Sequence, residues 1–122
     1  YRDPLFLKRI WGEVEVFNPD CIVGSSMGGW FGLHMAVHLN VPCMLFNPAV
    51  SKRTVEISVP PLGNARPEVD LLLGKTDDVV LGHEVLEWMD AHGFSAEVTW
   101  ANCGHRVPPE IYGLWLDDVL SL

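Results

Sequence analysis

Residues 24–29 carry the pattern G-x-S-x-G within the run Gly-Ser-Ser-Met-Gly-Gly, which is typical of a nucleophilic serine. The run follows a short apolar segment and precedes a helical one, and this strand–turn–helix setting gives the pattern its meaning. We expect Ser26 to lie on a sharp, strained turn, with Gly24 and Gly28 beside it because neither carries a Cβ. The Met27 N–H, at the start of the helix, is then placed to stabilise an oxyanion.

A serine hydroxyl is a weak nucleophile and needs a base, and the base needs an acid that orients it. With a serine of this type, the acid and then the histidine follow later in the chain, each after a strand. Asp77 follows the apolar segment 69–74, and His105 follows the segment 94–101. Asp78 competes with Asp77, and spacing does not separate them. This order of serine, acid and histidine predicts hydrolysis through an acyl-enzyme.

Each of these residues also has a structural interpretation. Either Ser25 or Ser26 could cap the helix that follows. An acid such as Asp77 is favourable at a helix N-terminus, whatever its chemistry. The histidine, His105, could be a solvated loop residue. Only a meeting of all three side chains in space separates the two interpretations.

Other reactive side chains form weaker patterns. His34 and His38 are one helical turn apart, but no third ligand follows at a suitable spacing, so we predict no metal site and expect both on a helix surface. Cys103 precedes the candidate base by two residues, but it has no activating turn of its own. Ser25, within the serine motif, and Trp30, close after it, are candidates for the substrate pocket, with core packing as the favoured role for Trp30.

Apolar periodicity predicts strands and helices in alternation. Short, mostly apolar runs suit strands buried on both faces, and an alternating run suits a strand that is half-exposed or near a sheet edge. The strands of the first kind are 20–24, 43–47 and 69–74, and the strand of the second kind is 94–101. Helical patterns cover 1–19, 27–40, 81–92 and a last segment opened by Pro108-Pro109, while 51–68 reads as a loop. This order predicts one α/β domain over residues 1–122, with a mostly parallel sheet flanked by helices. The site then gathers in loops at the carboxyl ends of the strands.

Composition limits the classes of protein to which the chain belongs. Its 122 residues suffice for one core, and 48% hydrophobic residues exclude a disordered chain. The 16 acidic against 8 basic residues give a net charge of −8, which argues against nucleic acid and anionic membrane surfaces as partners. No apolar run suits a spanning helix, and residues 1–8 lack a signal-peptide pattern. Three cysteines without metal-type spacing, Cys21, Cys43 and Cys103, predict free thiols and a cytoplasmic protein.

A family resemblance rests on four segments: Gly-Ser-Ser-Met-Gly-Gly-Trp at 24–30, Phe-Asn-Pro-Ala-Val at 46–50, Gly-Lys-Thr-Asp-Asp-Val at 74–79 and Gly-His at 104–105. Together these segments resemble the YqiA-like esterases, which are small, essentially lidless α/β-hydrolases; the Asn-Pro-Ala-Val run is the more specific match. The resemblance implies Ser26 as nucleophile, Asp77 as acid and His105 as base. It implies hydrolysis of carboxylic esters, with short acyl esters as the usual test substrates, and no cofactor. It places Asn47 near the site, as a candidate pocket residue, without a chemical role.

The resemblance covers almost the whole chain but only the C-terminal two-thirds of the family pattern. The family begins with a strand and a His-Gly-Phe type loop that supplies the other oxyanion amide, and residues 1–122 contain no such segment. Loss of one oxyanion donor typically lowers kcat by about 10²–10³. The strand at residues 21–24 then becomes an apolar edge. We expect a missing N-terminal segment or a second copy of the chain to pair with it.

Two functions of different classes follow from these residues. The first is a serine esterase acting on a small-molecule ester. The second is a non-catalytic or degenerate α/β-hydrolase fragment that keeps the serine turn and binds a ligand or partner, and the missing oxyanion segment favours it. Thioester or peptide hydrolysis by the same residues is a third, weaker option, because pocket walls set the substrate.

Overall fold

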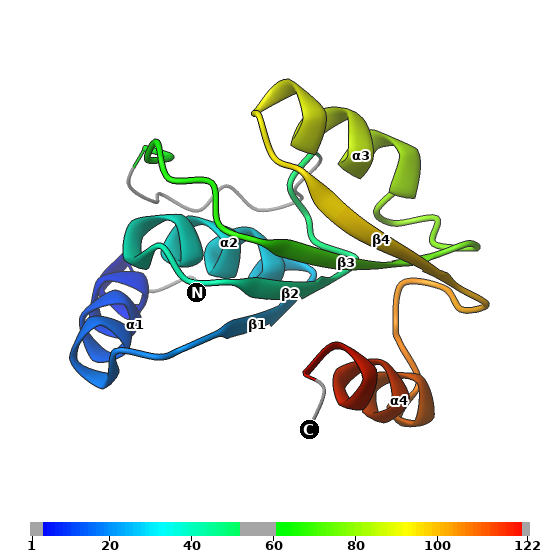
Figure 1. Ribbon diagram of the computed structural model, residues 1–122, viewed down its shortest axis with the longest axis horizontal. Coiled ribbons are helices and arrows are strands. Elements are labelled where there is room, and N and C mark those ends of the chain that lie inside the picture. The colour runs from blue at the N-terminus through cyan, green and yellow to red at the C-terminus, as the bar shows by residue number, and fades with distance from the viewer. Residues whose placement is uncertain (1–3, 52–60, 121–122) are drawn as a thin grey trace.

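The computed structural model describes residues 4–51 and 61–120 of the chain (Figure 1). Within these residues, helices and strands alternate in the order α1 Pro4–Phe17, β1 Ile22–Ser25, α2 Met27–Leu39, β2 Cys43–Phe46, β3 Val69–Gly74, α3 Gly82–Ala91, β4 Ala96–Ala101 and α4 Pro109–Leu120. The order predicted from the sequence is therefore confirmed. Of the predicted loop 51–68, residues 52–60 lie outside the described residues, and residues 61–68 contain neither helix nor strand.

The four strands form one parallel sheet in the order β1-β2-β3-β4. In its register Leu45 lies between Gly24 and Leu71, and Leu72 pairs with Thr99. Parallel neighbours must be joined by crossovers; α2 lies in the crossover between β1 and β2, and α3 in that between β3 and β4. All four strands end at the same edge of the sheet, so the loops that follow them meet there.

Helices cover both faces of the sheet (Figure 1). On one face, α2 and α3 pack through Leu33, Val85 and Met89 against alternate strand residues, including Leu45 and Leu71. On the other face, α4 packs against the remaining strand residues, with buried Trp115 and half-buried Tyr112 against Phe46. The alternation follows from the strand period of two, which sends successive side chains to opposite faces.

The first strand differs from the expectation that it is buried on both faces. Ile22 packs against the α2 and α3 face, but Val23 is 51% exposed and Ser25 is exposed. The core under α4 is built on β2, β3 and β4, so it does not cover this face of β1. The prediction of a doubly buried strand is therefore wrong for β1. The prediction that 94–101 lies near an edge is confirmed, because β4 is the last strand of the sheet among residues 4–51 and 61–120.

The first helix packs against α2 at the β1 end of the sheet (Figure 1). The ring centroid of Trp11 lies 5.7 Å from that of Phe31 and 5.0 Å from that of His38. His38 is exposed, as expected, but His34 is only 6% exposed and stacks edge-on against Trp30. The surface expectation for His34 is therefore wrong, because its ring is enclosed beside Trp30, whose carbonyl lies 3.0 Å from His34 Nδ1. In the described part of the chain, every helix is too short or too polar to span a membrane.

Candidate active site

Ser26 lies on the turn between β1 and α2, with φ 54° and ψ −119°. A serine with positive φ is strained and needs its surroundings to hold it there. Its N–H donates to the Phe46 carbonyl over 3.0 Å, and its own carbonyl accepts from the Ala49 N–H at 2.9 Å and the Gly29 N–H at 3.0 Å. The turn is thus fastened both to the end of β2 and to the first turn of α2.

Two glycines around Ser26 stand where a Cβ does not fit. A Cβ on Gly24 would clash with the Gly28 carbonyl oxygen, and a Cβ on Gly29 would meet the Cβ of Pro48 at 2.7 Å. A Cβ on Gly28 would meet nothing within 4 Å. The expectation that Gly28 is needed for space is therefore wrong. Gly28 is exposed, whereas Gly29 faces the loop after β2 and is the residue on which the close approach depends.

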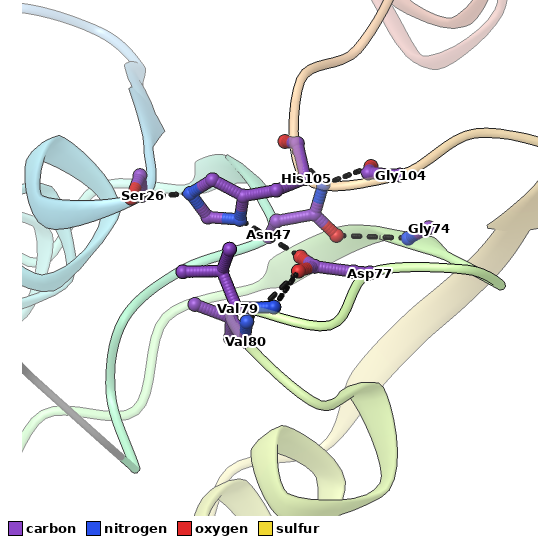
Figure 2. A network of polar contacts seen from close by, with 8 residues as sticks. All are labelled: Ser26, Asn47, Gly74, Asp77, Val79, Val80, Gly104 and His105. Atoms are coloured by element: carbon purple, nitrogen blue, oxygen red, sulfur yellow. Dashed lines mark hydrogen bonds and ion pairs between the residues drawn. The ribbon is translucent and has the colours of Figure 1, made fainter.

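Three side chains from separate loops form one chain of hydrogen bonds (Figure 2). The Ser26 hydroxyl lies 2.8 Å from Nε2 of His105, and Nδ1 of His105 lies 2.9 Å from Oδ2 of Asp77. A carboxylate can only accept hydrogen bonds, so Nδ1 carries the ring proton and its N–H donates a hydrogen bond to Asp77. Nε2 is then left unprotonated and accepts from the serine O–H. This is the arrangement in which an imidazole can take the serine proton.

The carboxylate of Asp77 is completely buried and has donors for both oxygens. Besides the imidazole on Oδ2, Oδ1 accepts from the Val79 N–H and the Val80 N–H, each at 2.8 Å. A buried charge needs such partners. Asp78 is exposed, so of the two neighbouring acids it is Asp77 that faces His105.

The first amide of α2 lies next to the serine. The Met27 N–H is among the helix N-terminal donors that have no partner within the helix. Such amides favour negative charge, so the Met27 N–H suits an oxyanion that forms on a carbonyl attacked by Ser26. The Met27 side chain instead packs against the core beneath α2 and α3.

The remaining candidates occupy different surroundings. Trp30 is half-buried, and its ring centroid lies 4.1 Å from that of His34 and 6.0 Å from that of Trp88. Trp30 therefore packs between α2 and α3, which is the alternative to a pocket role. Ser25, the last residue of β1, is exposed. Asn47 is 1% exposed and bonds to the backbone of the His105 loop (Figure 2). The sequence places Asn47 near the site only through the family resemblance, and no local pattern predicts these hydrogen bonds.

The cysteine near the site is not an activated thiol. Cys103 is buried, and its pKa is raised by burial and then by the negative charge of Asp77. A protonated thiol is a poor nucleophile. All three cysteines are free, and burial raises the pKa of Cys43 to about 12. Among residues 4–51 and 61–120, no three His, Cys, Asp or Glu side chains are grouped as a metal site would require.

Comparison with solved structures shows which fold this is. The chain matches a proposed hydrolase of the alpha/beta superfamily from Xanthomonas campestris pv. campestris with a TM-score of 0.70 and 19% identity, over 95% of this chain and 66% of that one. It matches the type II thioesterase BorB of the borrelidin biosynthetic cluster with a TM-score of 0.67 and 13% identity, over 94% of this chain and 65% of that one. It matches an alpha-beta serine hydrolase homologue from Coxiella burnetii with a TM-score of 0.61 and 20% identity, over 93% of this chain and 54% of that one.

The chain thus spans between about half and two thirds of the length of these neighbours. No protein-family model and no curated protein matches the sequence. The sheet order, the helices on both faces and the structural matches agree with one another. The chain has the α/β-hydrolase fold.

Proposed function

We propose that this protein is a serine hydrolase that cleaves carboxylic esters through an acyl-enzyme. The observation that carries the proposal is the pair of distances, 2.8 Å from Ser26 Oγ to His105 Nε2 and 2.9 Å from His105 Nδ1 to Asp77 Oδ2. Side chains that are 79 and 28 residues apart in sequence meet in the order nucleophile, base and acid. A solvated loop histidine or a capping serine needs no such partners.

The proposed reaction has two halves. As Ser26 Oγ attacks the ester carbonyl, His105 Nε2 takes the hydroxyl proton and Asp77 stabilises the imidazolium that forms. The Met27 N–H donates to the oxyanion, and collapse of the intermediate releases the alcohol with the proton from His105. Water then attacks the acyl-enzyme while His105 Nε2 takes a proton from it. The acyl–Oγ bond breaks, the acid is released, and His105 returns the proton to Ser26 Oγ. Ser26, His105, Asp77, the Met27 amide and water supply every group in these steps, so the proposed reaction needs no cofactor.

We propose short acyl esters as the first substrates to test. The support is the resemblance of the motifs to the YqiA-like esterases, above all the Asn-Pro-Ala-Val run at 47–50. A thioester is the second candidate, because one structural neighbour is a type II thioesterase and the same three residues would serve. Paired acetyl and butyryl esters and thioesters, compared by kcat/KM, separate the two substrate classes.

Covalent labelling tests the proposal most directly. A fluorophosphonate probe should label the intact 122-residue chain, and Ser26→Ala should abolish both labelling and turnover of p-nitrophenyl acetate, with a loss of about 10⁴-fold or more. Ser95→Ala, an exposed serine before β4, is the matched control and should label normally. A folded chain that takes no label rejects the proposal. Saturable binding of a ligand by that unlabelled chain would support the non-catalytic alternative.

A further inference from the structure

Asn47 adopts an unusual backbone conformation at the end of β2. It is 1% exposed, and its φ is 42°, in the left-handed region that asparagine tolerates better than most residues. Its N–H donates to the Leu72 carbonyl of β3 over 3.0 Å. The side chain then lies beneath the loop that carries His105, between that loop and Gly74 (Figure 2).

The buried amide of Asn47 joins two loops of the site. Oδ1 accepts from the Gly74 N–H at the end of β3, at 2.8 Å. Nδ2 donates to the carbonyl of His105 at 2.9 Å and to that of Gly104 at 3.2 Å. The amide nitrogen thus makes two hydrogen bonds and the amide oxygen one. The backbone from which the imidazole projects is held at a fixed place relative to β3.

The next two residues reach the serine. The Ala49 N–H donates to the Ser26 carbonyl over 2.9 Å. Pro48 lies so close to Gly29 that a Cβ there would meet it at 2.7 Å. Residues 47–49 therefore contact the backbone of the serine turn with one end and the backbone of the histidine loop with the other.

We propose that Asn47 is a positioning residue, and that residues 47–49 form a bridge that sets the distance between Ser26 Oγ and His105 Nε2. The side-chain hydrogen bonds of Asn47 join it to backbone atoms of the site, and it is almost fully buried, so it acts through His105 and not on the substrate. A misplacement of about 1 Å between reacting groups lowers the rate on the order of 10²-fold. The activity part of this inference rests on the proposed serine hydrolase function.

Two substitutions separate the amide from the backbone conformation. Asn47→Gly keeps the positive φ and removes the amide. Asn47→Asp keeps the shape and the acceptor for the Gly74 N–H, but it turns an oxygen instead of a donor towards two carbonyl oxygens. We expect each to lower kcat and the rate of Ser26 phosphonylation by about 10²-fold, with KM within about twofold. A new charge near His105 would affect the Asp variant alone, so losses in both assign the effect to the amide.

The ¹⁵N spectrum of His105 gives a readout that does not depend on turnover. In the wild-type chain, Nδ1 should resonate as a protonated nitrogen and Nε2 as an unprotonated one. In the Asn47 variants we expect the two shifts to move towards each other, as in an imidazole that exchanges tautomers. Val69→Ala is the control for general destabilisation, because Val69 is 2% exposed and lies at the start of β3, the end of the strand opposite to the loops of the site. It should lower the melting temperature and leave kcat and both nitrogen shifts unchanged.

The outcomes are distinct. Folded Asn47 variants with wild-type kcat and wild-type nitrogen shifts overturn the inference, whatever their melting temperatures. If the wild-type chain takes no fluorophosphonate label, the proposed function fails, and the nitrogen shifts still decide whether Asn47 positions His105. If neither Asn47 variant folds, Pro48→Ala relaxes the other end of the bridge and leaves its polar contacts in place. A smaller fall in kcat at unchanged KM supports the bridge, and an unchanged kcat rejects it.

Discussion

The carbonyl oxygen of Gly104 lies over Gly74, only 2.5 Å from the point where a Cβ on Gly74 would stand. The Cys103 carbonyl oxygen crowds the same point at 2.5 Å, and it also accepts from the Thr76 N–H at 3.2 Å. The loop that carries His105 is therefore packed directly on the start of the loop that carries Asp77. Base and acid are held by one interlocked pair of loops.

A Gly74→Ala substitution should disturb this contact. The obstructing atoms are backbone, which cannot turn aside, so we expect a loss of unfolding free energy of about 1–3 kcal/mol or more. Displacement of His105 should lower the rate of Ser26 labelling as well. Urea denaturation and fluorophosphonate labelling measure the two effects.

Gly113→Ala in α4 is the control for this prediction. A Cβ on Gly113 meets nothing within 4 Å, so the substitution should raise helix stability by about 1 kcal/mol. A Gly74→Ala protein that unfolds at the wild-type urea concentration would contradict the packing described here.

Asp77 and its neighbour offer a matched pair of substitutions. Asp77→Asn should lower kcat by about 10⁴-fold, because an amide can donate to Nδ1 and so hold the imidazole in the wrong tautomer. Asp78→Asn removes the same charge one residue away, from an exposed side chain, and should leave kcat close to wild type. Steady-state ester hydrolysis, with circular dichroism to check folding, measures both. Equal losses in the two variants would argue against Asp77 as the acid.

Regular elements were predictable from the sequence because their signals are local. The largely apolar run at 69–74, in which Asp70 is the one charged residue, predicts β3 with the bounds that the structure has, Val69–Gly74, because a strand buried on both faces shows little polar alternation. The order of Ser26, Asp77 and His105 was also predictable, since parallel strands send their following loops to one edge. The choice between Asp77 and Asp78 was not, because it depends on which side chain the turn sends inward.

Contacts between loops were the part that sequence could not give. The pattern G-x-S-x-G draws attention to Gly28, but the crowded position is Gly29, because Pro48 approaches from a segment 19 residues away. The bridging amide of Asn47 depends in the same way on where β3 and the histidine loop end. The open face of β1 depends on how far α4 reaches across the sheet. Each is a property of tertiary packing that no local pattern encodes.

The carboxylate of Asp70 should make stability depend on pH. Its pKa is raised by burial, then by the charges of Glu97 and Glu68, and Glu97 is its direct register partner on β4. Because this pKa is higher in the folded chain than in the unfolded chain, the folded chain binds more protons at pH values between the two pKa values. Stability therefore falls as the pH rises from the ordinary value of 3.8 through the raised one, and the cost remains at neutral pH.

Asp70→Asn should accordingly raise the melting temperature at pH 7, and the gain should shrink as the pH is lowered towards 4. Differential scanning calorimetry across that range tests the sign. The control is Glu87→Gln, which removes one exposed negative charge on α3 away from this cluster. An equal gain from Glu87→Gln would assign the effect to the net charge of −8 instead of to the cluster.

The outer edge of β1 is open in the part of the chain that the structure describes, since β1 has a strand on one side only. Val23 on this strand is 51% exposed. Beside the edge lies an apolar hollow of about 420 Å³ between α1, β1 and α2, lined by side chains that include Val14, Phe31 and Met35. An apolar edge without charges is free to pair with another strand.

We therefore predict that the 122-residue chain self-associates through β1, and that Val23→Lys weakens this association by placing a charge on the edge. Light scattering over a concentration series measures it: the wild-type mass should rise with concentration, and the rise should be smaller for the variant. Val16→Lys on α1 is the control, because Val16 is 88% exposed but lies off the strand. A wild-type chain that is monomeric and well folded over the whole series contradicts the prediction, and so does equal association of the two variants.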